Sequence, residues 1–143
     1  MVTVRRLLEM KKKGYWTITP ETTAYEALEI MADKNVGALM VVGEESQLLG
    51  IFTERDYSRK VVLRGRSSKA TAVSELMTRG VYFVSPQDTT ESCMEIMNDK
   101  RVRHLPVIDE GKLVGLVSIR DVVNMIIHER EATIRDLEQY IAS

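Results

Sequence analysis

The sequence contains one cysteine and two histidines, and this scarcity excludes several kinds of chemistry. Cys93 cannot form an internal disulfide, and it stands in a helical pattern rich in methionine and isoleucine, which favours a small core residue over a reactive thiol. With only His104 and His128 available, neither a nucleophile–base pair nor the spacing of metal ligands occurs in the sequence. We therefore expect no enzyme activity and no metal site.

The sequence also lacks a charge excess and a long apolar run. Its formal net charge of −1 provides no long-range attraction to a phosphate backbone, which argues against nucleic acid as a partner, although a small basic pocket remains compatible with it. No apolar run reaches the length of a membrane span, and the N-terminus lacks the apolar core and cleavage site of a signal peptide. These absences predict a cytoplasmic protein without a membrane partner.

The main feature that is present is a duplicated motif. Residues 50–56 reappear as residues 115–121, and in each copy a glycine precedes apolar residues, a hydroxyl residue and an Arg-Asp pair. This order predicts a buried strand that ends at Thr53 or Ser118 and turns directly into a helix. Two interpretations of the junction stay open. It is a capping box, which satisfies the free N–H groups of the helix start, or it is a nucleotide site built from the same groups.

The duplication covers most of the chain. Pro86 corresponds to Pro20 and Cys93 to Ala27, at a constant spacing that shortens by one residue after the turn at 109–112. Loops tolerate such changes of length. The sequence pattern of the first copy predicts strands at 15–19, 37–42 and 48–53, a helix at 23–34 and a further helix after Asp56, and the second copy repeats this order.

The repeats predict the fold class and the domain boundaries. The 143 residues, 44% of them hydrophobic, are enough for one soluble domain with its own core. We expect an α+β fold of tandem β-α-β-β-α repeats, whose apolar sheet faces pack together with pseudo-twofold symmetry. The first repeat spans residues 3–65, the second spans 71–128, and residues 129–143 form a C-terminal helical extension.

Two basic segments lie beside these elements. A short helix begins at Thr3 and runs through three lysines to Gly14 as its C-cap, and we assign the lysines to a solvated helix end. Residues 64–69 connect the two copies. They are either a flexible surface connection or part of a polyphosphate site formed by cations, Lys69 among them, and hydroxyl groups.

The helical pattern continues beyond Asp121 into an apolar stripe formed by Ile134, Leu137 and Ile141. The repeat does not require this stripe, and the polar face of the helix is evenly mixed rather than basic. We interpret the stripe as an assembly surface or an extension of the core, and we expect the chain to form at least a homodimer.

Taken together, the two copies resemble the cystathionine β-synthase (CBS) domain family, and the pair resembles the Bateman module. The marks are the doubled Gly-x-h-h-[Ser/Thr]-x-x-Asp motif and the sequence Val-Arg-His-Leu-Pro-Val at 102–107. Residues 53–57 and 65–69 are similar to those of stand-alone bacterial CBS-pair proteins and their plant organellar relatives. The resemblance implies a regulatory module that binds adenosine nucleotides (AMP, ADP, ATP or NAD(H)), commonly dimerises and passes its ligand state to a protein effector. It implies no catalysis.

The resemblance also implies where the ligands bind. In that family each cleft combines the [Ser/Thr]-x-x-Asp motif of one repeat with the first two strands of the other. A carboxylate can accept from both ribose hydroxyls, strand backbone can bond the adenine edge, and arginine or lysine can bind phosphate. Carried over, one cleft comprises Thr53, Arg55, Asp56, Tyr82, Arg103 and His104, the other comprises Ser118, Arg120, Asp121, Trp16, Gly37 and Ala38, and Lys69 is a further candidate.

The two clefts are not expected to be equivalent. Where the second copy has Arg103 and His104, the first has Gly37 and Ala38, which removes two potential cations and opens space. We therefore expect the cleft with the cations to favour a compact phosphate, and the other to take a bulkier ligand or to bind weakly. The alternative hypothesis is a ligand-independent interaction module that assembles through its C-terminal helix.

Overall fold

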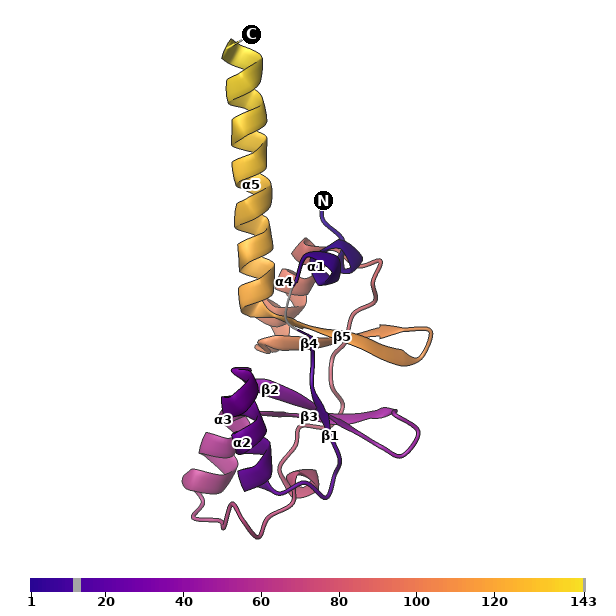
Figure 1. Ribbon diagram of the computed structural model, residues 1–143, viewed down its shortest axis with the longest axis vertical. Coiled ribbons are helices and arrows are strands. Elements are labelled where there is room, and N and C mark those ends of the chain that lie inside the picture. Colours follow the sequence, from indigo (N-terminus) through magenta and orange to yellow (C-terminus); the bar gives the residue numbers. More distant parts are fainter. Residues whose placement is uncertain (12–13, 143) are drawn as a thin grey trace. The chain divides into compact units, whose positions relative to one another are not determined.

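The computed structural model (Figure 1) describes residues 1–11 and 14–142 and divides into two compact units. Unit 1 consists of Met1–Gly14, Phe83–Asp109 and Val114–Ser143, and unit 2 consists of Tyr15–Tyr82 and Glu110–Leu113. Both units combine helices with strands, which confirms the predicted α+β class.

Unit 2 contains the elements of the first repeat. They are β1 (Thr17–Ile18), α2 (Ala24–Lys34), β2 (Ala38–Val42), β3 (Leu48–Thr53), α3 (Glu54–Tyr57), the π-helical turn η1 (Ser58–Val62) and the 3₁₀ turn η2 (Val73–Glu75). The three strands form one sheet in the order β1-β2-β3, with β1 parallel and β3 antiparallel to β2. Leu39, Val41 and Phe52 are fully buried in the core of this unit.

Unit 1 contains the second repeat together with the N-terminal helix. Its elements are α1 (Val4–Met10), α4 (Thr90–Lys100), β4 (His104–Asp109), most of β5 (Lys112–Ser118) and α5 (Ile119–Ala142). Strands β4 and β5 pair with each other. Val4 and Leu7 of α1 lie in the same buried cluster as Leu105, Val117 and Val122, so the N-terminal helix is part of this core.

Hydroxyl caps start α2 and α4, the corresponding helices of the two repeats. The side chain of Thr23 accepts a hydrogen bond from the N–H of Glu26 at the start of α2, and Thr89 occupies the same position at α4. The two helices end where Asn35 and Arg101 adopt the left-handed conformation, with φ of 53° and 56°. Asparagine tolerates this conformation better than most residues. The predicted α2 helix is thereby confirmed within one residue at its start.

Cys93 lies in the core of unit 1, as predicted, with no exposed surface. Burial raises the pKa of its thiol to about 11, with smaller contributions from the negative charges of Asp88 and Glu91. Such a thiol is protonated at neutral pH and therefore unreactive.

The segments 4–8 and 73–77, which lie before the first strand of each repeat, pack in the same way, and this match extends the duplication. The N–H of Val4 donates to the carbonyl of Asp88 at 2.7 Å in unit 1, and the N–H of Val73 donates to the carbonyl of Thr22 at 2.8 Å in unit 2. The sequences Val-Arg-Arg-Leu-Leu at 4–8 and Val-Ser-Glu-Leu-Met at 73–77 therefore occupy equivalent places. Consequently residues 4–8, which lie before the first strand of the first repeat, pack with the second repeat.

The predicted extent of the N-terminal helix is wrong. Helix α1 ends at Met10 rather than near Gly14, because the chain turns to an extended conformation at Lys11. The Lys11 ammonium donates to the carbonyl of Leu116 at 2.8 Å, so this lysine is not part of a solvated helix end. The other two lysines, at positions 12 and 13, lie outside the described residues.

The first strand of each repeat is shorter than predicted. Only Thr17–Ile18 of the segment 15–19 forms β1, an edge strand that ends before Pro20, which has no N–H to donate. Its counterpart in the second repeat is a single bridge between Val84 and Val107. There the next N–H, of Ser85, donates to the carboxylate of Asp88 at 2.7 Å rather than to a strand.

Helix α5 continues without a break from the motif at its start to Ala142. The helix expected for residues 129–143 is therefore a direct continuation of the last helix of the second repeat, and Ser143 lies outside the described residues.

Candidate functional site

The motif in unit 2 forms a capping box at the start of α3. The hydroxyl of Thr53 accepts a hydrogen bond from the N–H of Asp56 at 3.1 Å. In return, Oδ2 of Asp56 accepts from the N–H and from the hydroxyl of Thr53, at 3.0 and 3.1 Å. The first of the two interpretations of the motif, helix capping, is thus present in the structure.

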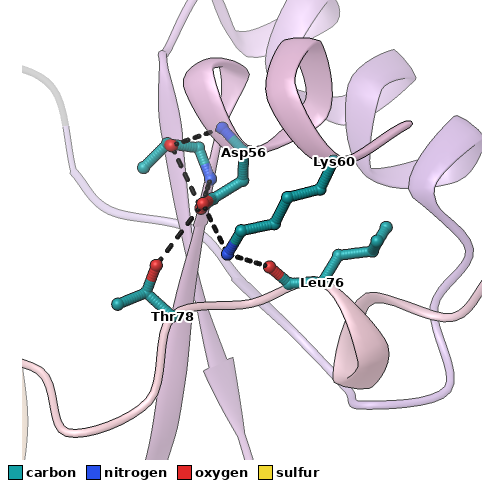
Figure 2. A network of polar contacts seen from close by, with 5 residues as sticks. Asp56, Lys60, Leu76 and Thr78 are labelled. Carbon is teal, nitrogen blue, oxygen red and sulfur yellow. Dashed lines mark hydrogen bonds and ion pairs between the residues drawn. The ribbon is translucent and has the colours of Figure 1, made fainter. Parts of the chain in front are cut away.

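The second oxygen of Asp56 is also occupied, as Figure 2 shows. The ammonium of Lys60 lies 3.1 Å from Oδ1, and the hydroxyl of Thr78 donates to the same oxygen at 3.4 Å. Lys60 also donates to the carbonyl of Leu76 at 2.8 Å. Because Asp56 is buried, these donors compensate for the loss of water around its charge. The lysine also ties the helical turn after the motif to the segment 73–78.

The motif in unit 1 has the same cap and a different lysine. The hydroxyl of Ser118 accepts from the N–H of Asp121 at 3.1 Å, and Oδ2 of Asp121 accepts from the N–H of Ser118 at 2.9 Å. Lys11 lies 2.8 Å from the same Oδ2. Met125 stands at the position that corresponds to Lys60, so the cation arrives from the N-terminal segment instead of from the helix.

Strands β3 and β5 end in the two motifs. In each unit, the start of the strand that pairs with them, β2 or β4, lies against the motif of the same unit. In unit 2, Ala38 pairs with Thr53, and the carbonyl of Gly37 accepts from the N–H of Glu54 at 3.1 Å. In unit 1, the carbonyl of Arg103 accepts from the N–H of Ile119 at 2.9 Å. The structure therefore brings Gly37 and Ala38 next to the Thr53 motif, and Arg103 next to the Ser118 motif.

The remaining candidate residues of unit 2 lie at its surface. Trp16 is 39% exposed, and the ammonium of Lys34 lies 4.7 Å from the centroid of its ring. Arg55 and Tyr82 are exposed. Lys69 stands 4.7 Å above the ring of Tyr25, so the connecting segment 64–69 is attached to α2 through this contact.

Among the candidate residues of unit 1, His104 has a shifted pKa. Burial lowers the pKa of its imidazole below the usual 6.5, the positive charge of Lys11 adds to this effect, and Asp121 partly opposes it. The imidazole is therefore neutral at pH 7. The remaining candidate, Arg120, is exposed on the first turn of α5.

Each predicted cleft draws residues from both units, so these pairings stay predictions. Thr53, Arg55, Asp56 and Tyr82 belong to unit 2, whereas Arg103 and His104 belong to unit 1. The second cleft likewise combines Ser118, Arg120 and Asp121 of unit 1 with Trp16, Gly37 and Ala38 of unit 2.

A cavity of about 450 Å³ lies in unit 1 beside the motif aspartate. Sequence reasoning predicted Asp121 and missed the other lining residues. The match between residues 4–8 and 73–77, which the hydrogen bonds of Val4 and Val73 make evident, places the N-terminal segment in the same unit as the second motif. The lining residues are Leu7, Met10, Lys11, Asp121, Asn124, Met125 and His128.

The described residues contain neither a cluster of metal ligands nor a membrane-spanning helix. Among residues 1–11 and 14–142, no group of three or more histidine, cysteine, aspartate and glutamate side chains could hold a metal ion. In the same described part of the chain, no helix is long and apolar enough to cross a membrane.

Comparison with known proteins gives consistent matches over most of the chain. The family model for the CBS domain matches residues 1–62 and 73–128. The CBS domain-containing protein CBSX3 of Arabidopsis thaliana, named as mitochondrial, is 42% identical over 147 residues, covering 97% of this chain and 71% of CBSX3. A solved structure of a protein with CBS domains from Burkholderia ambifaria MC40-6 has a TM-score of 0.83 at 47% identity, covering 89% of this chain and 95% of that one. The structure of CBSX2 in complex with AMP has a TM-score of 0.74 at 26% identity, covering 91% and 99%.

Proposed function

Because the chain belongs to the CBS domain family, we propose that it is a regulatory module that binds adenosine nucleotides and has no catalytic activity of its own. The observation that carries the proposal is the duplicated motif, which places a carboxylate, a hydroxyl and an arginine at a strand–helix junction in each unit. AMP in the CBSX2 structure supports the ligand class. AMP, ADP, ATP and NAD(H) are the candidate ligands.

The chemistry of the candidate residues fits an adenosine nucleotide. A motif carboxylate can accept hydrogen bonds from ribose hydroxyls, and backbone groups of β2 or β4 can recognise the adenine edge. Arg55, Arg103 and Arg120 are exposed and can bind phosphate oxygens with two parallel hydrogen bonds. Binding would bias the state of the module, which a protein effector then reads.

A second candidate function is assembly through α5, and the exposed apolar stripe favours it. Ile134, Leu137 and Ile141 are 54%, 56% and 82% exposed, and Figure 1 shows that the C-terminal part of α5 extends beyond α1 and α4 of the same unit. An apolar stripe that its own unit leaves exposed favours a homodimer. Assembly and nucleotide binding are compatible, and the tests below separate them.

A thermal unfolding panel tests nucleotide binding. A nucleotide present at a hundred times its Kd should stabilise the chain by about 2.7 kcal/mol, because it binds the folded state and not the unfolded one. We expect AMP, ADP, ATP or NADH to raise the Tm and GMP at the same concentration to have a much smaller effect. The guanosine nucleotide is the matched control, because it differs only in the base edge. Equal shifts with AMP and GMP, or no shift with any adenosine nucleotide, would refute the proposal.

A further inference from the structure

We propose that the two motif aspartates have different roles, in which Asp121 binds the nucleotide and Asp56 is a structural group held by Lys60. This assignment rests on the proposed nucleotide binding and says which of the two motifs performs it. It differs from the expectation, drawn from Arg103 and His104, that the Asp56 cleft favours a compact phosphate and the Asp121 cleft takes a bulkier ligand or binds weakly.

The hydrogen-bonding capacity of Asp56 is already used. A carboxylate has two oxygens with about four acceptor sites in total. Oδ2 accepts two hydrogen bonds from Thr53, and Oδ1 takes Lys60 and Thr78 (Figure 2). The side chain is only 11% exposed. A ribose hydroxyl could bond this carboxylate only by displacing the lysine or the threonine, and the displaced groups would lose their partner in a buried place.

Asp121 keeps acceptor capacity. Its Oδ2 takes the N–H of Ser118 and the ammonium of Lys11, whereas Oδ1 accepts no hydrogen bond from the part of the chain that the structure describes. The side chain is 20% exposed, nearly twice the value for Asp56. One carboxylate oxygen with two lone pairs can therefore accept from ribose hydroxyls without breaking the cap or the ion pair.

The cavity beside Asp121 has the chemistry of a nucleoside site. Its volume of about 450 Å³ lies in the range of small-molecule sites, roughly 300–1,000 Å³. Met10 and Met125 provide apolar walls against which a flat base can pack, and Asn124 offers both a donor and an acceptor. Lys11 donates to two oxygens, which leaves its third N–H for a ligand.

Lys60 is the residue that makes the surroundings of Asp56 different from those of Asp121. The corresponding position in the second repeat is Met125, which cannot donate to the carboxylate. The match of residues 4–8 with 73–77 places Gly80 of unit 2 at the position of Lys11, and glycine supplies no cation. Changing Lys60 to Met therefore frees one acceptor site on Oδ1 of Asp56, which still accepts from Thr78.

Calorimetric titration of the full chain with AMP tests the assignment. Wild type should bind about one AMP per chain. Asp121→Asn replaces one acceptor oxygen with a donor and should weaken AMP roughly tenfold to a hundredfold. The matched variant Asp56→Asn should change the AMP affinity less than about threefold, while it lowers the urea midpoint because the partner of Lys60 is lost. Lys60→Met should raise the stoichiometry above one.

The outcomes separate this inference from the proposed function. An equal loss of AMP affinity in the two Asp→Asn variants, a loss only in Asp56→Asn, or two equivalent AMP molecules per wild-type chain would overturn the assignment. No binding of any adenosine nucleotide to wild type would overturn the proposed function itself. If Asp56→Asn fails to fold, Thr78→Val removes one donor from the same oxygen without leaving a lysine unpaired. It should leave the AMP affinity of the wild type intact, and a tenfold loss would contradict the inference.

Discussion

Among single residues, His104 couples the stability of the fold to pH. Its pKa is lowered in the folded chain, first by burial and then by Lys11. The unfolded chain therefore binds a proton near pH 6.5 that the folded chain binds only at lower pH. The free energy of unfolding should consequently be fully maintained above about pH 7 and fall as the pH drops below 6.5.

Urea unfolding between about pH 5 and pH 7.5 checks this prediction. His104→Gln keeps a polar side chain of similar length and removes the titration, so its stability should fall less than that of wild type over this range. An identical pH dependence in the variant and the wild type would show that other groups cause the loss.

At the residue scale, the sequence predicts contacts that are close along the chain and misses those that are not. The caps at Thr53 and Ser118 follow from a three-residue spacing, which local pattern reading detects. Lys60 lies four residues after Asp56, so its ion pair could also have been predicted from local spacing. The bond of Thr78 to Asp56 and the ion pair of Lys11 with Asp121 could not, because these residues are far apart along the chain. Lys11 reaches Asp121 from the far end of the chain, and nothing local to the three lysines distinguishes it from a solvated helix end.

At the scale of elements, Gly50 of β3 lies against the segment 73–78, and Gly115 of β5 lies against the segment 4–8. A Cβ added at Gly50 would lie 2.8 Å from the backbone carbonyl oxygen of Thr78 and 2.8 Å from the sulfur of Met77. A Cβ added at Gly115 would lie 2.9 Å from the terminal methyl groups of Leu8. A side-chain end can rotate away, whereas a backbone carbonyl in a ladder cannot.

We therefore predict that Gly50→Ala destabilises the chain more than Gly115→Ala. The first should lower the free energy of unfolding by about 1–3 kcal/mol through overpacking, and the second by about 1 kcal/mol or less. Urea denaturation of both variants measures the difference. Equal effects would mean that Met77 and Thr78 adjust as easily as Leu8.

The bounds of a helix or strand can be predicted from the sequence where its own terminal residues determine them. Helix α2 begins at a threonine cap and ends at a left-handed asparagine, and both signals are local. The first strand of the second repeat is different, because the Asp88 carboxylate captures the N–H of Ser85 and leaves one bridge at Val84. Competition between a side chain and a strand partner depends on tertiary packing, which periodicity does not reveal.

At the scale of the whole molecule, the exposed stripe on α5 makes assembly testable. Leu137→Lys places a charge in the stripe and should reduce the fraction of dimer at micromolar concentration while AMP affinity stays unchanged. Gln139→Lys adds the same charge at a position rotated away from the stripe and is the matched control. Light scattering measures the mass of each variant. A monomeric wild type, or equal masses for both variants, would contradict assembly through α5.

The duplication and the α+β fold could be predicted from the sequence, because they rest on patterns that recur at nearly constant spacing. The grouping of the N-terminal helix with the second repeat could not. The match between residues 4–8 and 73–77 is short, and it falls outside the constant spacing that relates the rest of the two copies. Only the equivalent hydrogen bonds of Val4 and Val73 make it evident.

This grouping has a consequence during protein synthesis. Val4 and Leu7 are translated well before their partners in the buried cluster, which extend from Val84 to Met125. Unit 2 consists almost entirely of residues 15–82 and can complete most of its contacts earlier. The apolar side chains of Val4 and Leu7 therefore stay unburied during synthesis until their partners have been made. Exposed apolar surface makes an incompletely folded chain prone to aggregation and a target for chaperones.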